Sequence, residues 1–384
     1  MDTPVPDSVD IAQPVTDPAG AGGSAAASTN PGNRPNDPAF ADLAHSDPLL
    51  PHVIINDQVL GDPGYQPVDL YGQSGITPVV ASCPHAGRTY PAAMMRLTGQ
   101  PISGLRGLED FGVDCLLGAL PATGICLLVN RLSRAYLDVN RSSAALDPSM
   151  FIDSTATMMP FPDKRTRQKD GVSKALAAIA KAKPDSHVRA GYGLLPRLTA
   201  TRQHIYGDRL PVEEAQRRIN VIHTPYHATL ADLLQTAHRR FGQALLVDFH
   251  SMPAYDRQNT RLPDIVLGDG GGTTISKDTG AAIAKHLSAA GLTVGWNHPY
   301  AGGHITRHYG DARGTQQSLQ IEINRDLYMD GPNRLNIEKT MHLADIIGAV
   351  ARRLKLFNPG MSPFVAVFHS ADAFSPLHVE ETGA

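Results

Sequence analysis

Several apolar runs in this chain end abruptly in polar side chains, and this pattern restricts the fold more than any other feature. The clearest run, residues 244–247, is Ala-Leu-Leu-Val, and it leads directly into Asp248, Phe249, His250 and Ser251. A continuous apolar run predicts a strand that is buried on both faces, as in a parallel or mixed sheet. Ligands gather outside the carboxyl ends of the strands in such sheets. His250 is therefore either a ligand-contacting residue or a buried histidine hydrogen-bonded to backbone.

Three other runs end in the same way: residues 78–85 end in His85, residues 125–131 end in Asn130 and Arg131, and residues 319–325 contain Glu322. These strands alternate with segments of helical pattern. The alternation predicts an α/β fold with a mostly parallel or mixed sheet.

Composition and charge limit the kinds of partner and the cellular compartment that we expect. The formal net charge of −3, without a basic block, argues against nucleic acid or an anionic membrane as the main partner. No apolar run reaches the roughly 18 residues of a membrane span, and the amino terminus lacks the pattern of a signal peptide. Cys83, Cys115 and Cys126 have no CxxC spacing and are interpreted as reduced core residues. We expect a soluble cytoplasmic protein with a small acidic molecule as its partner, and the oligomeric state stays open.

The two strand-end histidines are candidate metal ligands. A catalytic zinc keeps three protein ligands and one open position for water. His85 and His250 would supply two nitrogens, and a carboxylate would complete the set, with Asp110 favoured over Glu109. We therefore predict one Zn²⁺ per chain. The alternative for the two acidic residues is the first turn of an amphipathic helix over 108–117, where they would complement the helix dipole.

Two further carboxylates have predicted roles near this metal. Asp248 lies two residues before His250, on the same side of an extended chain, and is expected to orient that imidazole. Glu322 lies between two isoleucines, so it faces away from both, and a buried Glu is costly unless it is paired or catalytic. It is the candidate base that takes a proton from water and passes it to the leaving amine. The alternative is an ion pair with Arg325.

Arginines are the candidate anion-binding residues. Arg131, Arg134 and Arg141 lie close together, and Asp138 can orient one of them; a guanidinium fork is the usual partner of a carboxylate. Arg134 is expected to stabilise the oxyanion. Arg141 and Arg307, the latter in a Gly-hinged loop, are expected to hold a substrate carboxylate. The alternatives are a solvated basic loop and an ordinary glycine turn. Several arginines beside one metal indicate amide hydrolysis on a small acidic molecule.

Three histidines, His223, His227 and His238, lie at helical spacings in a helix predicted over 211–242. We interpret them as surface or hydrogen-bonded residues rather than as ligands. Pro225 is expected to kink or break this helix, because proline removes a backbone donor and clashes with the preceding turn.

Together these motifs resemble the N-formylglutamate amidohydrolase family. The matching segments, in family order from about residue 78 to 330, are Pro84–Gly87, Asp138–Arg141, Pro225–His227, Asp248–Pro253, Gly302–Arg307 and Gln320–Arg325. The resemblance implies a fold like that of the zinc carboxypeptidases and aspartoacylases, a three-layer α/β/α sandwich around a mixed, mostly parallel sheet. It also implies hydrolysis of N-formyl-L-glutamate to formate and L-glutamate, the last step of one histidine-degradation route.

The resemblance also implies roles for individual residues. His85 and His250 look like the zinc ligands, Glu322 like the catalytic Glu, and Asn140 with Arg141 like the substrate clamp; Thr306 and Arg307, in another matching segment, are taken as further substrate-binding residues. One position departs from the wider clan. The related carboxypeptidases carry a Glu ligand three residues after the first His, where this chain has Arg88. The third ligand must come from elsewhere, and Asp110 is the inferred one.

We expect a disordered leader over 1–47, a single catalytic domain over 48–358 and an irregular tail over 359–384. The leading hypothesis is a zinc-dependent amidohydrolase acting on an N-formyl or other N-acyl acidic amino acid. A second hypothesis is a carboxypeptidase-like hydrolase of a short peptide or cell-wall fragment. The third is a non-catalytic binder of an acidic metabolite, which would need neither metal nor Glu322.

Overall fold

The computed structural model describes residues 52–56, 60, 65–152 and 186–354, which all fall in the unit Gly32–Ala384. The predicted leader (1–47) and tail (359–384) lie outside these residues. Within the described part, no helix has the length and apolar character needed to cross a membrane.

The central sheet has the strand order β10-β9-β11-β8-β3-β5-β2. Its strands are β2 (Val68–Tyr71), β3 (Val79–Cys83), β5 (Cys126–Asn130), β8 (Ala244–Met252), β9 (Ile265–Gly268), β10 (Val294–Trp296) and β11 (Gln316–Asn324). The neighbours β11, β8, β3 and β5 run parallel, as do β9 and β10. Only β9 against β11 and β2 against β5 are antiparallel. The prediction of a mixed, mostly parallel sheet is confirmed.

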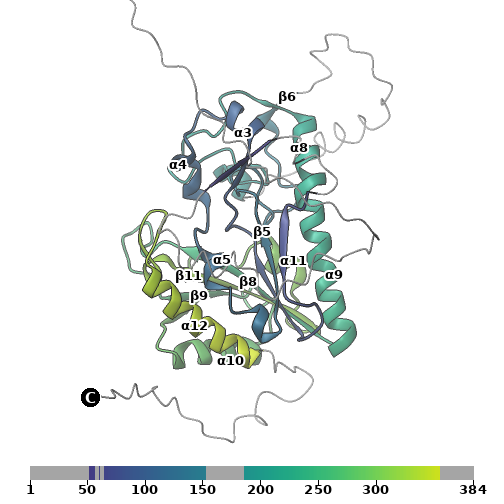
Figure 1. Ribbon diagram of the computed structural model, residues 1–384, viewed down its shortest axis with the longest axis vertical. Coiled ribbons are helices and arrows are strands. Elements are labelled where there is room, and N and C mark those ends of the chain that lie inside the picture. The colour runs from purple at the N-terminus through teal and green to yellow at the C-terminus, as the bar shows by residue number, and fades with distance from the viewer. Residues whose placement is uncertain (1–51, 57–59, 61–64, 153–185, 355–384) are drawn as a thin grey trace, which may run out of the picture. The chain divides into compact units, whose positions relative to one another are not determined.

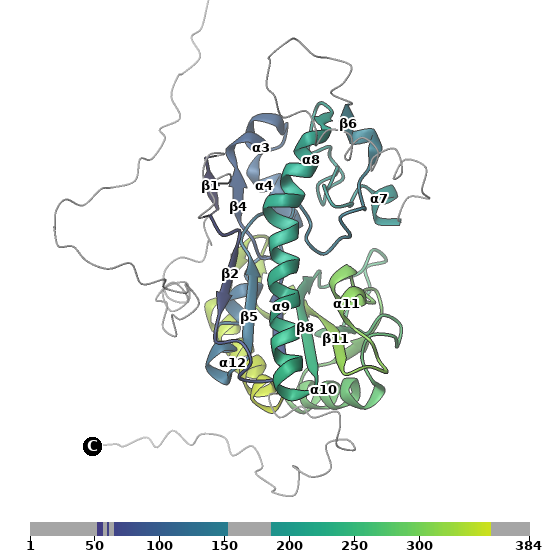
Figure 2. The same cartoon turned by 90° about the vertical axis from the view of Figure 1, so that its right-hand side faces the viewer.

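Helices cover both faces of this sheet (Figures 1 and 2). One face carries α9 (Thr224–Phe241) and α11 (His304–Tyr309), and the other carries α5 (Val113–Leu116), α10 (Lys277–Ala289) and α12 (Ile337–Leu354). The layers are therefore helix, sheet and helix, which confirms the predicted α/β/α sandwich.

The alternation of side chains along β8 determines which face carries polar groups. Leu245 and Phe249 pack in the cluster that contains α10 and α12, whereas Leu246 packs in the cluster that contains α9. Because successive side chains of a strand point to opposite faces, Asp248 and His250 lie on the same side as Leu246. The polar residues of β8 therefore face the layer of α9 and α11.

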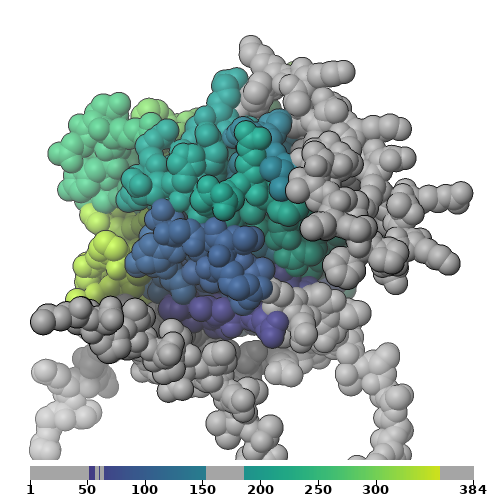
Figure 3. Space-filling view, turned by 90° about the horizontal axis from the view of Figure 1, so that it is seen from above, coloured from purple at the N-terminus to yellow at the C-terminus, as the bar shows by residue number. Residues whose placement is uncertain are grey.

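The remaining elements are short and lie mostly beyond the carboxyl edge of the sheet. They are β1 (Val53–Ile55), β4 (Thr89–Pro91), α3 (Ala92–Leu97), α4 (Ile102–Leu105), η1 (Arg106–Leu108), η2 (Pro121–Thr123), η3 (Pro148–Met150), β6 (Phe151–Ile152), α7 (Ser186–Ala190), β7 (Leu210–Pro211), α8 (Val212–Arg218), η6 (Arg325–Leu327), β12 (Met329–Gly331) and β13 (Arg334–Leu335). Segments distant in sequence pair here: the Thr98 hydroxyl donates to the Ile205 carbonyl at 2.6 Å. In Figure 3 the blue surface of the first segment lies against the teal surface of the second.

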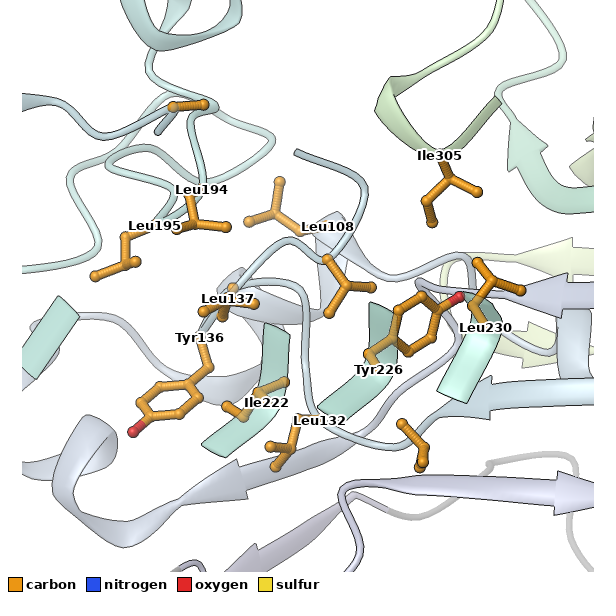
Figure 4. Packing of buried hydrophobic residues seen from close by; sticks show 14 of the residues in the cluster. Leu108, Leu132, Tyr136, Leu137, Leu194, Leu195, Ile222, Tyr226, Leu230 and Ile305 are labelled. Atoms are coloured by element: carbon orange, nitrogen blue, oxygen red, sulfur yellow. The ribbon is translucent and has the colours of Figure 1, made fainter. Parts of the chain in front are cut away.

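The helix predicted over 211–242 is interrupted, as Pro225 suggested. A π-helical segment, η5 (Ile219–His223), separates α8 from α9, and Pro225 lies in the first turn of α9. The wider π turn accommodates a proline ring that a regular α-helical turn would exclude. Tyr226 and Leu230 of α9 then pack into the buried cluster shown in Figure 4. The helix ends at Gly242, whose φ of 71° is the left-handed conformation typical of a helix terminus.

A buried ion-pair network fixes the segment that follows β3. Asp114 of α5 is fully buried, and the Arg88 guanidinium donates to both of its oxygens at 3.0 Å. Arg131, just after β5, donates to the same carboxylate at 3.2 Å. Burial alone would raise the pKa of Asp114, but the two guanidinium groups outweigh burial and lower it. Arg88, three residues after His85, is thus held in an ion pair with Asp114.

Replacing this carboxylate should destabilise the protein strongly. We expect Asp114→Ala to lower the free energy of unfolding by about 3–5 kcal/mol at pH 7, because two largely buried guanidinium groups lose their partner. The pKa of Asp114 is lowered on folding, so its contribution is complete above the unfolded pKa of about 3.9 and is lost as the pH falls through the folded value. Denaturant unfolding at several pH values measures this.

The control is Asp345→Ala on the exposed face of α12, which should change stability by less than about 0.5 kcal/mol. A difference between wild type and Asp114→Ala that stays constant down to the lowest pH would contradict the ion-pair account.

Candidate metal centre

Two neighbouring parallel strands bring the two predicted histidines together. His85 lies two residues after β3, and His250 lies inside β8, whose Asp248 is in register with Ser82 of β3. The ring centroids of His85 and His250 are 4.8 Å apart. Asp110 joins them through the backbone, because its N–H donates to the carbonyl oxygen of His85 at 3.0 Å. Both imidazoles and this carboxylate therefore meet at the carboxyl edge of the sheet.

The segment around Asp110 differs from the helix predicted over 108–117. Glu109 has extended backbone, and α5 begins only at Val113, after Gly112 in the left-handed conformation with φ of 76°. The predicted helix start was therefore wrong, and neither acidic residue lies in a first helical turn. Gly112 explains the difference, because such a φ interrupts a helix and favours glycine.

Three ligand atoms face one another at this edge. Asp110 Oδ2 is 3.0 Å from His250 Nδ1 and 3.4 Å from His85 Nδ1. Within the described residues, this is the one group of His, Cys, Asp and Glu whose ligand atoms all lie within 4.8 Å of one another, and all three members are buried. His85 Nδ1 is a buried nitrogen without a hydrogen-bond partner there. Two imidazole nitrogens and one carboxylate oxygen fit a zinc ion that keeps one position for water.

The outer nitrogen of each imidazole contacts a further carboxylate. Asp138 Oδ1 is 2.7 Å from His85 Nε2, and Asp248 Oδ2 is 2.9 Å from His250 Nε2. A carboxylate at this nitrogen fixes the tautomer and directs the Nδ1 lone pair towards a metal. The predicted contact of Asp248 is present. The sequence had indicated Asp138 only as an arginine partner, and its contact with His85 depends on loop geometry that no local pattern reveals.

The charges around the three candidate ligands hold a proton at His250. Burial opposes the charged imidazole, but Asp248 and Asp110 outweigh burial and raise the pKa of His250 well above its usual value. Burial would raise the pKa of Asp110, yet its hydrogen bond to His250 and the nearby imidazole of His85 lower it well below its usual value. A cation binding here would therefore displace a proton and take over its charge-balancing role.

Asp110 faces the centre and Glu109 does not. The Tyr90 hydroxyl donates to Glu109 Oε1 at 2.5 Å, and Arg106 donates to its other oxygen at 3.2 Å. Asp110 Oδ1 accepts from Ser251 Oγ at 3.1 Å, which leaves Oδ2 towards the imidazoles. The geometry supports the predicted preference for Asp110 over Glu109.

Glu322 lies beside His250 on the adjacent strand β11, where the two residues are in register. The Gln320 side chain donates to Glu322 Oε1 at 2.8 Å, as expected for residues on one face of a strand. Burial raises the pKa of Glu322 to about 8. Arg325, the alternative partner, instead donates to Ser251 Oγ at 3.0 Å and to the Glu109 carbonyl at 2.8 Å. Glu322 is thus a buried carboxyl positioned to exchange a proton near the candidate metal.

Arg134 also belongs to this site. Its Nε donates to Asp138 Oδ2 at 2.9 Å. Burial would lower its pKa, but the charges of Asp138, Asp110 and Glu322 outweigh burial and raise it. A guanidinium within range of all three acids can stabilise an oxyanion formed there.

Asn140 and Arg141 lie next to the imidazoles but have partners inside the protein. Asn140 Oδ1 accepts the backbone N–H of Ile305 at 2.7 Å, and its Nδ2 lies 3.2 Å from His250 Nε2. Arg141 donates to the Tyr192 carbonyl at 3.0 Å and to the Asn140 carbonyl at 2.8 Å. Substrate binding by these two residues stays a prediction, and their observed contacts join α11 and the loop before it to the candidate metal centre.

Thr306 and Arg307 of α11 make their contacts away from the three candidate metal ligands. Thr306 is fully buried, and its hydroxyl has no hydrogen-bond partner in the described part. Arg307 is exposed and donates to the carbonyl oxygens of Gly302 and Gly270 at 3.1 and 3.3 Å. No contact among the described residues joins either side chain to the three candidate ligands, so their substrate-binding role also stays a prediction.

Tyr300 is a neighbour of the centre that the sequence did not reveal. Burial and then the charges of Glu322 and Asp110 raise its pKa, which places its hydroxyl in the field of the acidic groups. Its position in the Gly-hinged loop that also contains Arg307 was the available signal.

Separate substitutions of the two adjacent acidic residues should distinguish the metal ligand from the structural carboxylate. We expect Asp110→Asn to weaken zinc binding by more than about 100-fold, because an amide cannot supply the anionic oxygen, whereas losing an outer partner typically costs 10–100-fold. Glu109→Gln should retain zinc affinity. Chelator competition on metal-free protein measures both, with circular dichroism to check folding. Equal affinities for the two folded variants would rule out Asp110 as a ligand.

Known proteins of one family are similar to this chain. The family model described as N-formylglutamate amidohydrolase matches residues 77–329. An N-formylglutamate deformylase of Pseudomonas aeruginosa is 28% identical over 286 residues, which are 73% of this chain and 92% of that protein. A second one, from Pseudomonas putida, is 34% identical over 125 residues, which cover 31% of this chain and 45% of that protein.

Solved structures show the same relationship. The crystal structure of an N-formylglutamate amidohydrolase from Ralstonia eutropha is 32% identical, with a TM-score of 0.64 over 76% of this chain and 97% of that one. A gene product of Agrobacterium tumefaciens, 18% identical with a TM-score of 0.52 over 76% of this chain and 95% of that one, shares the fold. The match of the family model over most of the described residues, together with these relatives, shows that this chain belongs to the N-formylglutamate amidohydrolase family.

Proposed function

We propose that this protein is a zinc-dependent amidohydrolase that converts N-formyl-L-glutamate and water into formate and L-glutamate. The observation that carries the proposal is the convergence of His85, Asp110 and His250 beside the buried carboxyl of Glu322. Membership of the family and the names of its relatives support the reaction and the substrate. The cytoplasmic location and the absence of nucleic-acid and membrane partners remain predictions from the sequence.

The two imidazoles and the Asp110 carboxylate would hold the metal. Zinc at this position would lower the pKa of a bound water and polarise the formyl carbonyl. Asp138 and Asp248 keep the outer nitrogens of the imidazoles engaged, so that both Nδ1 atoms stay directed inward.

Glu322 and Arg134 would carry the proton and charge changes of the reaction. The Glu322 carboxylate takes a proton from the attacking water and delivers it to the amide nitrogen, so that the C–N bond breaks and L-glutamate leaves with a neutral amine. The Arg134 guanidinium stabilises the negative charge that develops on the former carbonyl oxygen. The substrate carboxylates would be held by arginines such as Arg141, whose Nε lies 3.7 Å from Asp138 Oδ2.

Removal of the proton carrier should abolish turnover without removing the metal. We expect Glu322→Gln to lower the kcat for formate release from N-formyl-L-glutamate by at least about 100-fold, because the amide neither accepts nor delivers the proton. Zinc content should stay near one per chain. Formate release and metal analysis on the same samples test both statements.

The matched control is Glu338→Gln on the exposed face of α12, which should retain full activity. If the wild type binds zinc but does not release formate, the proposed metal centre is retained and N-formyl-L-glutamate is rejected as the substrate. If the wild type shows neither zinc binding nor turnover, even after zinc is added back, the hydrolase proposal is overturned and a non-catalytic binder of an acidic metabolite is favoured.

A further inference from the structure

A second group of histidines lies beside the candidate metal centre. His223 of η5, His227 of α9, and His304 and His308 of α11 form this histidine cluster. The ring centroids of His223 and His227 are 4.2 Å apart, those of His227 and His304 are 5.8 Å apart, and those of His304 and His308 are 5.2 Å apart. The consecutive segments η5 and α9 contribute one imidazole each and α11 contributes two, so the cluster depends on the packing of α11 against η5 and α9.

The two inner imidazoles hold the loop that orients the metal ligands. His223 Nε2 donates to the Arg141 carbonyl at 2.9 Å, and His227 Nε2 donates to the Val139 carbonyl at 2.9 Å. His227 Nδ1 is also within 3.0 Å of the Tyr309 hydroxyl. These hydrogen bonds agree with the interpretation from sequence for His223 and His227, and they place the cluster directly against the loop that contains Asp138 and Arg141.

The outer imidazoles retain unused hydrogen-bonding nitrogens. In the described part of the chain, His304 and His308 have ring contacts but no hydrogen bond or ion pair, and His223 uses only its Nε2. Exposure rises across the cluster, because His223 is buried, His227 and His304 are half-buried, and His308 is exposed. The free nitrogens therefore lie where a ligand arriving from solvent can reach them.

Among the described residues, the histidine cluster has no carboxylate of its own as a partner. Burial and the neighbouring His308, His223 and Arg141 lower the pKa of His304 to about 4, and only Asp138 opposes them. Asp138 is already shared by His85, Arg134 and Arg141. No carboxylate within the described residues forms an ion pair with an imidazole of the cluster, and an added anion would raise the pKa of each imidazole that it contacts.

A metal ion explains the cluster less well than an anion does. Zinc needs nitrogens about 2.0–2.1 Å from one central point. Among the residues that the structure describes, only His85, Asp110 and His250 bring three ligand atoms within 4.8 Å of one another. The cluster therefore does not bring three ring nitrogens together as a metal requires, but a carboxylate with two oxygens can accept from donors on different rings.

We propose that His223, His304 and His308, together with Arg141, form the subsite that binds the side-chain carboxylate of an acidic N-acyl amino acid. The inference rests on the proposed function, because it places the scissile amide at the candidate metal centre and the far end of the substrate against the histidine cluster. The cluster then selects dicarboxylic substrates, since a neutral side chain would leave its donors without the ionic partner they attract.

The test compares two substrates of nearly equal shape. We would measure kcat/KM of the zinc-loaded protein for N-formyl-L-glutamate and N-formyl-L-glutamine, in the wild type and in the double variant His304→Gln, His308→Gln. The preference for the glutamate substrate should fall at least about 10-fold in the variant, mainly through KM for that substrate. His342→Gln on the exposed face of α12 is the control and should keep the wild-type preference.

A binding measurement tests the subsite independently of turnover. Calorimetry of L-glutamate and L-glutamine with metal-free protein, in two buffers of different ionisation heat, reports protons taken up on binding. A carboxylate raises the pKa of the imidazoles that it contacts, so L-glutamate should bind with proton uptake that is greatest between the pKa of free His304, about 4, and its higher value in the complex. L-glutamine should show less uptake, and the double variant should lose the difference between the two ligands.

The outcomes separate this inference from the proposed function. If the wild type hydrolyses neither substrate, the proposed function fails, and the calorimetric difference between L-glutamate and L-glutamine still decides the subsite. An unchanged substrate preference in a folded double variant, or proton uptake that the variant retains, would overturn the subsite. A second equivalent of bound zinc that the double variant loses would also overturn it, in favour of a metal site.

Discussion

Burial of negative charge at the carboxyl edge of the sheet is the constraint on which the rest of this structure depends. Asp110, Asp138 and Asp248 are all at most 4% exposed. Taking such charges out of water costs several kcal/mol each unless cations and hydrogen bonds compensate them. Two imidazoles and the neighbouring arginines supply this compensation, and a divalent ion would add to it. The acidic groups thus explain why so many basic side chains converge on one edge of the sheet.

The loop Asp138–Arg141 connects this edge to the histidine cluster. Its Asp138 carboxylate orients His85, and its carbonyl groups accept from His223 and His227. Asn140 in the same loop accepts from the amino end of α11 and would lie only 2.4 Å from a Cβ at Gly303. A side chain at position 303 would therefore displace Asn140. One four-residue loop consequently determines the spacing between the candidate metal ligands and the imidazoles of α11.

Much of the core of this site was predictable, because it follows from the geometry of strands. Parallel neighbours end at the same edge, which predicts that His85 and His250 meet, and the two-residue period of β11 predicts that Glu322 turns away from the apolar layer. The contact of Asp138 with His85, the place of Tyr300 and the gathering of histidines from η5, α9 and α11 depend on how loops and helices pack. No local pattern encodes those distances. Gly112 likewise delays the start of the helix to Val113, whereas the apolar spacing predicts a start at Leu108.

The contacts that complete the centre join residues that are far apart in the chain. His250 and Asp110 are separated by 140 positions, and Arg325, which donates to the Glu109 carbonyl, is 216 positions from its partner. Contacts of such separation form late in folding, because the entropy of closing long loops is lost before the contacts compensate it. During synthesis the ribosome releases both imidazoles and Asp110 well before β11. Release of these residues does not by itself form the site, because His250 and Asp110 are themselves distant in the chain. Glu322 reaches its place beside His250 only when β11 pairs with β8, so hydrolysis would require the complete sheet.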